Sequence, residues 1–310
     1  MKSKNVFYGW YVAICCSLIY FFVNSMTLFV PQNLFPTFIE EFSLNREQAS
    51  LTVRNTLLFA ALLSPFSGIL IDKYGVTVVM RIGIIVMALT YSFYPFASSI
   101  ETLYRLHILM AAGLVMTGLG PNVIIVSNWF NKHRGKVVGM VVASSSLGGA
   151  TLPLLISPIV SNPDWGWRWG FGLLAVLFWM FAVIPVYKII RPSPEAMGLN
   201  PDGIKEISQD QAKNKQIEDK DMTTFKDAIF SRALWCLGIG SACLWFSIQG
   251  LNSQIRIFFE LDAGFTAQQS VLLFSIIYWF SFIGKFSFGA LSDKLPKRTV
   301  LFLSSCVLFI

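Results

Sequence analysis

The stretch GILIDKYG occupies residues 68–75, and a near-copy, GALSDKLP, occupies residues 289–296, 221 positions further along the chain. Both copies follow a long apolar run and contain an aspartate followed by a lysine. An acid–base pair in this place marks the point where a hydrophobic segment meets water. The repeat therefore concerns the ends of two long hydrophobic segments, and it indicates two related units in one chain.

The repeat continues upstream of these stretches without a gap. The same offset aligns FSLNREQA (42–49) with AGFTAQQS (263–270). In this alignment Asn45 and Thr266 are equivalent, and each is a polar residue of the kind that caps the start of a helix. The sequence therefore predicts two equivalent long helices, each opened by a cap and each ending at the Gly-x-Leu-x-Asp-Lys sequence.

The composition places the chain in a lipid bilayer. Hydrophobic residues make up 55% of the 310 residues, whereas charged residues make up only 13%. A soluble domain of this length is much less apolar. The net charge of +7 is therefore interpreted through membrane topology, and no nucleic-acid partner is expected. The five cysteines and two histidines form no metal or nucleophile pattern, and no phosphate-binding GxxxxGK[ST] loop occurs, so no cofactor, metal site or enzyme activity is expected.

Eight segments are long and apolar enough to cross about 30 Å of hydrocarbon as helices. They are residues 7–30, 46–71, 77–98, 102–129, 136–158, 167–189, 229–251 and 267–291. A ninth apolar segment begins near Thr299 and reaches the last residue, Ile310, after twelve residues, which predicts a chain truncated within helix nine. Lysine and arginine gather in the loops on the side of the N-terminus. The positive-inside rule therefore predicts a cytoplasmic N-terminus in the plasma (inner) membrane.

The predicted fold is all-α, a polytopic membrane helix bundle of three parts. Residues 1–189 form an N-terminal six-helix half, and residues 190–228, which hold the only long polar stretch, form a cytoplasmic linker. Residues 229–310 form an incomplete C-terminal half with helices seven, eight and the start of nine. Two repeated helical units joined by a linker are typical of a secondary transporter with parallel repeats.

The two repeated stretches resemble the signature loop of the major facilitator superfamily, and the likeness covers the whole chain. The first copy departs from the pattern because no basic pair follows Gly75, and the second has Pro296 where glycine is usual. Further stretches resemble the bacterial oxalate/formate antiporter and monocarboxylate transporter branch. These stretches are FYGWYV (7–12), WFNKHRGKVVGMVVASSSLGG (129–149), DWGWRWGF (164–171) and RPSPEAMGLNPDG (191–203).

The resemblance implies a transporter of a small organic anion, a mono- or dicarboxylate, that works by alternating access. The mode is proton symport or exchange, and the expected partners are the lipid bilayer, the anion and, for symport, protons. Two alternatives stay open: a sugar-acid or anion:cation symporter of the same superfamily, and a truncated remnant that does not transport.

The resemblance also implies a gating role for the two repeated loops. A glycine lets two helix backbones approach closely, and an aspartate at a helix end can accept hydrogen bonds from the N-terminal amides of a neighbouring helix. The alternative is that these are solvated loop charges that follow the positive-inside rule. The residues concerned are Gly68, Asp72, Lys73 and the partner Arg134 for the first copy, and Gly289, Asp293, Lys294 and Arg298 for the second.

Lys285 is the residue most costly to place in a membrane, since it lies inside the apolar run FSFIGKFSFGALSD. A charge at the bilayer centre costs about 2.5–3.5 kcal/mol on insertion scales. In the resembled transporters a cation stands four positions before the glycine of helix eight, as Lys285 stands before Gly289, and this implies anion binding. The alternative is a lysine whose flexible stem reaches the aqueous interface, or one in a structural pair.

Polar side chains on helices one and seven are further candidates for substrate binding. Helix one carries Tyr20, Asn24 and Thr27 at helical spacing, and helix seven carries Trp245, Gln249, Asn252 and Arg256 in the same rhythm. The alternative is interhelical hydrogen bonding within the bundle. Arg105 resembles a proton-coupling arginine of the superfamily, with an interfacial arginine as the alternative. The serines at positions 144–146 are interpreted as packing residues.

Overall fold

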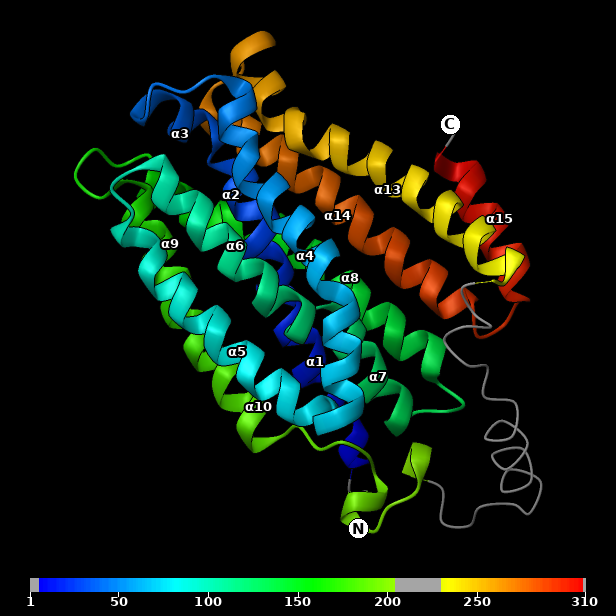
Figure 1. Ribbon diagram of the computed structural model, residues 1–310. Helices are drawn as coiled ribbons and strands as arrows, with labels where there is room; N and C mark the ends of the chain where they lie inside the picture. The colour runs from blue at the N-terminus through cyan, green and yellow to red at the C-terminus, as the bar shows by residue number, and fades with distance from the viewer. Residues whose placement is uncertain (1–5, 204–229, 309–310) are drawn as a thin grey trace, which may run out of the picture. The chain divides into compact units, whose positions relative to one another are not determined.

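The computed structural model describes residues 6–203 and 230–308, apart from the side chains of residues 233, 297, 307 and 308. Every regular element in the described residues is a helix (Figure 1). The chain falls into two units, one made of Met1–Gly203 with Arg256–Ile310 and the other of Ile204–Ile255. Each is described by itself. Most of the predicted linker, residues 204–228, lies outside the described residues, so the three-part division of the chain stays a prediction.

The first unit contains most of the helices. In its N-terminal part these are α1 (Tyr8–Asn24), the π-helical turn η1 (Ser25–Phe29), α2 (Val30–Asn33), α3 (Phe35–Glu41), α4 (Arg46–Tyr74), α5 (Val76–Phe93), η2 (Tyr94–Phe96), α6 (Ile100–Thr117), α7 (Leu119–Trp129), α8 (Arg134–Val160), α9 (Gly166–Phe178), η3 (Trp179–Val183), α10 (Ile184–Lys188), η4 (Glu195–Met197) and η5 (Pro201–Gly203). Its C-terminal part contains η6 (Phe258–Asp262), α14 (Ala267–Leu291) and α15 (Lys297–Leu308). The second unit contains most of α13 (Arg232–Ile257).

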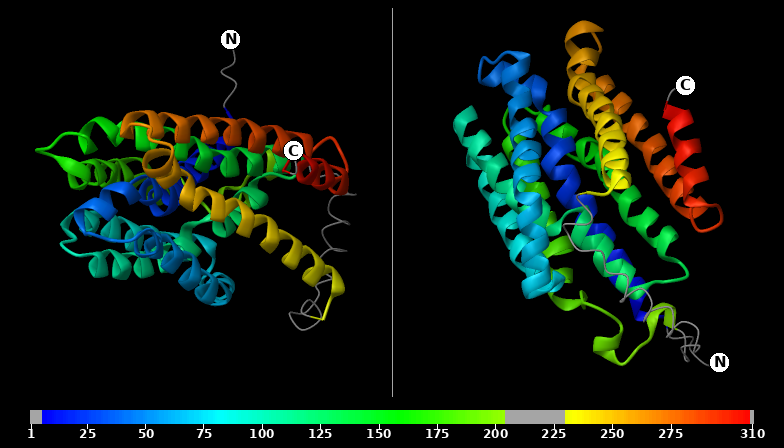
Figure 2. Two further views of the ribbon diagram at one scale, coloured as in Figure 1. Left: turned by 90° about the horizontal axis from the view of Figure 1, so that it is seen from above. Right: turned by 45° about the vertical axis from the view of Figure 1, so that its right-hand side comes forward.

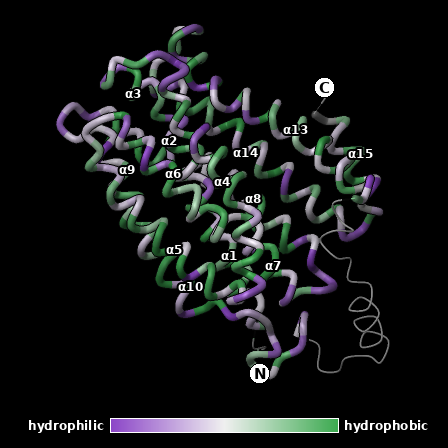
Figure 3. Tube along the Cα trace, in the orientation of Figure 1, coloured by the Kyte–Doolittle hydropathy of each residue, from purple (hydrophilic) through white to green (hydrophobic). Residues whose placement is uncertain are grey.

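Eight helical stretches of the described residues are long and apolar enough to cross a membrane, as predicted. They are Tyr8–Asn33, Arg46–Tyr74, Val76–Phe96, Ile100–Trp129, Arg134–Val160, Gly166–Lys188, Leu234–Asp262 and Ala267–Leu291. Figure 3 shows hydrophobic residues along most of the helical length and many of the hydrophilic residues near the helix ends. The predicted all-α polytopic bundle is confirmed.

The structure confirms the two predicted caps. Asn45 opens α4 with a capping box, in which its side chain accepts a hydrogen bond from the Gln48 amide and the Gln48 side chain accepts one from the Asn45 amide. Thr266 opens α14 with the same reciprocal pair, made with Gln269. Two donors that a helix start leaves unpaired are thereby satisfied in both copies. The sequence repeat is therefore also a repeat of local structure.

Buried polar groups join the helices of the first unit to one another. The Thr56 hydroxyl on α4 lies 2.7 Å from Nδ1 of His107 on α6, and the Tyr94 hydroxyl of η2 lies 3.1 Å from Nε2 of the same ring. Thr27 of η1 meets the Tyr91 hydroxyl of α5 at 2.7 Å. These pairs satisfy polar groups that lipid would leave unpaired, which makes them structural contacts.

Helices α8 and α14 run side by side in opposite directions, and this pair organises the candidate site (Figures 1 and 2). The C-terminal end of α14 meets the N-terminal end of α8, where Asp293 contacts Gly135. In the middle of both helices Lys285 contacts Ser146. We call the first of these places the Asp293 end. The opposite end, where Arg256 contacts Asn33, is called the Arg256 end.

Candidate functional site

The ammonium group of Lys285 lies among hydroxyl groups. Its Nζ atom is 2.6 Å from the Ser146 hydroxyl and 3.4 Å from the Ser145 hydroxyl, and Ser146 is in turn 2.9 Å from the hydroxyl of Ser281. Ser145 and Ser146 are buried. Lys285 forms no ion pair with the described residues. None of their carboxylates therefore lies within 4 Å of its ammonium group. The cation is therefore solvated by neutral hydroxyls.

Helix α1 closes one side of this hydroxyl cluster. The Ser25 hydroxyl donates a hydrogen bond to the Ser145 carbonyl over 3.1 Å. The close approach requires glycine at position 148, because a Cβ carbon there would lie 2.6 Å from the Phe21 carbonyl oxygen. Tyr20, a predicted binding residue, is buried on α1, and its side chain reaches that of Ser145. Lys285, Tyr20 and the serines are thus brought together.

A cation in this setting favours an anionic ligand. Lipid and apolar side chains do not solvate a charge, and a hydroxyl dipole compensates an ammonium group less well than a carboxylate does. The Lys285 ammonium keeps three donors, of which the serine contacts use two. A ligand carboxylate or phosphate oxygen would complete the coordination and offset the charge.

The second repeated loop makes the contact that its aspartate suggests. The two carboxylate oxygens of Asp293 accept hydrogen bonds from the backbone amides of Gly135 and Lys136, over 2.9 and 2.7 Å. These amides belong to the first turn of α8, whose own N-cap residue, His133, makes no side-chain cap. Asp293 therefore caps α8 from another helix, and its charge lies at the positive end of the helix dipole.

The partners of Asp293 are backbone amides at a helix start, which is the kind of partner that the loop pattern predicts. Lys294 and Arg298 are exposed, and the ion pairs of the described residues include neither of them. The loop glycine has a close contact as well, since Gly289 of α14 faces Gly139 of α8. The helix backbones approach each other at this pair as the loop pattern suggests. The gating roles of these residues stay predictions.

The first repeated loop is exposed to solvent in the structure. Asp72, Lys73 and Arg134 are exposed, and no ion pair among the described residues joins Asp72 to Arg134. A Cβ carbon on Gly68 would meet nothing within 4 Å. Gly75 ends α4 at a φ of 83°, in the region that favours glycine. Asp72 therefore has no ion-pair partner among the described residues, and the gating role of this copy stays a prediction.

A buried arginine occupies the Arg256 end of the α8–α14 pair. The Arg256 side chain is 5% exposed and forms an ion pair with Glu260. Its Nε donates to the Asn33 side chain over 3.1 Å, and its Nη2 donates to the Ala267 carbonyl over 3.2 Å. These bonds tie Arg256 to α2 and to the first residue of α14. Arg256 thus makes the interhelical hydrogen bonds that the sequence left open as the alternative for the polar stripe of helix seven.

Other predicted residues are not brought to the Lys285 cluster by any described contact. Gln249 and Asn252, with Trp245, lie in the second unit, so their binding role stays a prediction. Arg105 is exposed on α6, and its coupling role is likewise untested. Asn24 is buried on α1, one turn from Tyr20.

Sequence reasoning did not assign Ser145, Ser146 and Ser281 to the site. For Ser281 a signal existed, because it precedes Lys285 by four residues and must therefore share its helix face. For Ser145 and Ser146 no sequence signal existed, because their meeting with Lys285 depends on the register between α8 and α14.

Comparison with known families identifies this arrangement. A sequence profile of the Major Facilitator Superfamily matches residues 17–310. The chain belongs to this superfamily. This is a family of transporters. The chain is therefore a multi-pass membrane protein of a transporter family and not an enzyme.

Two curated relatives and one solved structure illustrate the similarity. The chain is 22% identical over 309 residues to a probable hexose phosphate transport protein of Chlamydia pneumoniae, which covers 94% of this chain and 65% of that protein. It is 25% identical over 245 residues to monocarboxylate transporter 4 of Gallus gallus, covering 74% and 46%. A crystal structure of a bacterial homologue of the human lysosomal transporter Spinster, inward-facing and unoccupied, matches with a TM-score of 0.68 and 20% identity over 96% of this chain and 64% of that one. The chain spans less than two thirds of the length of these proteins.

Proposed function

We propose that this superfamily member serves the secondary active transport of a small organic anion, a mono- or dicarboxylate, with Lys285 as the cation of the binding site. One observation carries the proposal: the Lys285 ammonium is held by the Ser146 hydroxyl at 2.6 Å, without a carboxylate among the described residues to neutralise it. An ammonium group so placed inside a bundle is costly, and a bound anion offsets the cost.

The relatives support an anionic ligand without choosing its class. One relative carries the name of a hexose phosphate transport protein and another that of a monocarboxylate transporter. Hexose phosphates and monocarboxylates share a negative charge and acceptor oxygens. The alternative is therefore an anionic sugar derivative, as in a sugar-acid symporter of the superfamily, and it is favoured by the first relative. A lysine binds either ligand as a point charge and lacks the planar fork with which arginine selects carboxylates.

Alternating access needs contacts that hold one side closed without locking it. Asp293 bound to the first turn of α8 is such a contact, because helix-dipole and charged hydrogen-bond interactions at a surface are worth about 0.3–2 kcal/mol. A bias of this size lets a ligand shift the equilibrium between two states. In this proposal the N-terminus and the Asp293 end face the cytoplasm, and the protein lies in the plasma membrane. Proton symport and exchange both fit the site.

Ligand-dependent thermal stability of the purified 310-residue chain tests the proposal. The ligands are acetate, lactate, oxalate, glucuronate and glucose 6-phosphate, with xylose as a neutral comparison. A ligand at 100 times its Kd stabilises by about 2.7 kcal/mol, which is a clear rise in Tm. We expect at least one carboxylate to raise Tm in the parent chain and in Lys285→Arg, but not in Lys285→Gln.

Lys188→Gln is the matched control, because this lysine is exposed at the end of α10 and makes no part of the cluster. It should respond to ligands as the parent does. Stabilisation only by glucuronate or glucose 6-phosphate would favour the sugar-derivative alternative. Stabilisation that survives in Lys285→Gln, or that xylose produces equally well, would contradict the proposal.

A further inference from the structure

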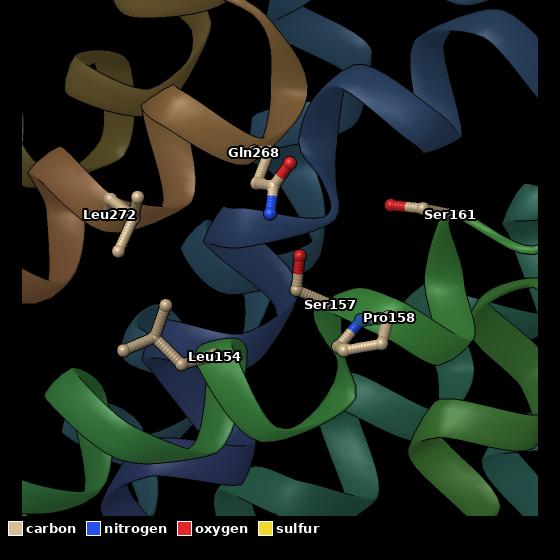
Figure 4. Close-up of a pocket in the computed structure, with 6 residues that line it drawn as sticks. All are labelled: Leu154, Ser157, Pro158, Ser161, Gln268 and Leu272. Carbon is tan, nitrogen blue, oxygen red and sulfur yellow. The ribbon is translucent and has the colours of Figure 1, made fainter.

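A cavity of about 230 Å³ opens between α8 and α14 at the Arg256 end. Figure 4 shows the residues that line it, which are Leu154, Ser157, Pro158, Ser161, Gln268 and Leu272. The side chains of Ser157 and Gln268 point toward each other, and the Ser161 hydroxyl points into the same space. Leu154 and Leu272 form an apolar wall. The cavity thus offers a few polar groups beside an apolar surface, as ligand sites do.

A smaller cavity of about 50 Å³ adjoins this one and contains the charged groups. It shares Ser157 and Ser161 with the larger cavity, and Arg256, Glu260 and Asn33 also line it. Asn33 is 6% exposed, and its amide nitrogen has no hydrogen-bond partner among the described residues. Because Arg256 neutralises Glu260, the free groups here are mainly donors, and donors suit a ligand with acceptor oxygens. We call the two cavities together the vestibule.

An aromatic pair lies between the vestibule residues and Lys285 in the order along α8 and α14. The rings of Phe29 and Tyr278 lie 4.4 Å apart between centroids, and both residues are buried. Gly149 of α8 supports the pair, because a Cβ carbon there would lie 2.7 Å from the Phe29 ring and 2.8 Å from the Tyr278 ring. A side chain at position 149 would therefore collide with both rings.

The order of these features is the same on each helix that lines the path. From the vestibule toward the Lys285 cluster, the order is Ser157, Gly149 and Ser146 on α8, then Leu272, Tyr278 and Lys285 on α14, and Asn33, Phe29 and Ser25 on the stretch from α2 back to η1. Three helices agree on the sequence of vestibule, ring pair and cation. The buried Phe274 of α14, whose ring centroid lies 4.7 Å from that of Tyr278, adds a third ring on the vestibule side of the pair.

Two features of the ring layer indicate movement and ligand passage. Phe29 belongs to η1, and a π-helical turn inside a longer helix is frequent at functional sites. The Tyr278 hydroxyl and the Ser275 hydroxyl, three residues apart on α14, are buried and lack a hydrogen-bond partner among the described residues. Buried hydroxyls without partners are costly, and a passing polar ligand would satisfy them.

We propose that the vestibule is a second binding site for the small anion, and that the Phe29–Tyr278 pair is the gate through which the anion reaches Lys285. This rests on the proposed function for the identity of the ligand. The vestibule binds acceptor oxygens through Asn33, Ser157 and Gln268, and the gate opens when the rings part above Gly149.

Thiol labelling tests the gate without measuring transport. The five native cysteines are replaced by alanine, Ser146→Cys reports on the Lys285 cluster, and Ser161→Cys reports on the vestibule, because Ser161 lines both cavities and is not one of the proposed binding residues. A charged, water-soluble thiol reagent should label Ser146→Cys slowly, and the added change Tyr278→Ala should raise that rate about tenfold or more, since an open gate becomes the populated state. The labelling rate of Ser161→Cys should not change. Phe29→Ala as the opening change and Ser281→Cys as the reporter repeat the test if either variant folds poorly.

An unchanged rate at both inner reporters after the gate is opened would overturn the gate. The vestibule is tested separately with oxalate and acetate, which should slow labelling of Ser161→Cys even when Lys285→Gln is present. If the anions protect the vestibule cysteine in the parent background but not when Lys285→Gln is present, the vestibule does not bind the anion by itself. This result would overturn the second site. Protection that persists while Lys285→Gln has no effect on ligand-dependent stability would contradict the proposed function and leave the vestibule supported.

Discussion

Gly139 of α8 and Gly289 of α14 face each other so closely that a Cβ carbon on Gly139 would lie 2.8 Å from the Cα atom of Gly289. Four residues after Gly289, the Asp293 carboxylate binds the first turn of α8. The glycine pair and the aspartate thus work together. The absence of side chains at the crossing brings α14 close enough for its loop to cap the neighbouring helix.

Replacing Gly139 by alanine should separate the two helices. The added methyl group meets backbone that cannot rotate away, so Gly139→Ala is expected to lower the free energy of unfolding by about 1–3 kcal/mol, as overpacking does. Gly68→Ala on α4 is the matched control, because nothing lies within 4 Å of its added carbon. It should be neutral or slightly stabilising, since alanine favours a helix over glycine. Equal losses in Tm for both variants would contradict the close crossing.

Asp293→Asn should weaken the cap on α8. The amide keeps one acceptor oxygen but loses the charge that favours the helix N-terminus, so we expect a loss of about 1 kcal/mol in the free energy of unfolding. Asp72→Asn, in the equivalent loop of the first repeat, should change Tm little, because Asp72 has no ion pair among the described residues. Thermal unfolding in one detergent compares the two. A larger loss of Tm in Asp72→Asn than in Asp293→Asn would contradict this prediction, because it would show that Asp72 has a stabilising partner.

The parts of the fold that local sequence determines could be predicted. Asn45 and Thr266 cap their helices as expected because a cap is a local contact between residues three apart. The eight apolar segments follow from the bilayer thickness and need no knowledge of packing. Asp293 accepts amide hydrogen bonds at a helix end, which is the kind of contact expected from its place in the loop.

The parts of the fold and the site that depend on packing between helices could not be predicted from the sequence. The partners of Asp293 are the amides of Gly135 and Lys136, and a backbone N–H group has no signature in the sequence. The serine stretch at 144–146 was interpreted as packing, yet Ser146 holds the Lys285 ammonium because α8 and α14 run antiparallel in one particular register. Arg256 shares a helical rhythm with Gln249, but its observed partners include Asn33 of α2.

Ser146→Ala should destabilise the chain and weaken anion binding together. The change removes the shortest contact of the Lys285 ammonium and leaves the Ser281 hydroxyl without its partner, at a cost of about 1–3 kcal/mol for buried polar groups. Ser144→Ala is the control, since the Ser144 hydroxyl bonds only to the Val141 carbonyl of its own helix in the described residues. Its effect should be within about 0.5 kcal/mol. Tm with and without carboxylate measures both effects, and identical behaviour of the two variants would exclude a positioning role for Ser146.

Arg256→Gln and Arg46→Gln should differ in their effects, because Arg256 is buried and Arg46 is exposed. The Arg256 and Glu260 side chains are 5% and 23% exposed, so removing the arginine leaves the half-buried Glu260 without a counter-charge and Asn33 without its donor, at about 1–3 kcal/mol. Arg46 and Asp262 are 47% and 40% exposed despite two contacts of 2.6 and 2.8 Å, and such pairs contribute little. Raising the ionic strength to about 1 M, where the Debye length is about 3 Å, should abolish any effect of Arg46→Gln and leave that of Arg256→Gln. A large, salt-resistant loss of Tm in Arg46→Gln would contradict this ranking, because it would show that the exposed pair between α4 and η6 stabilises the chain strongly.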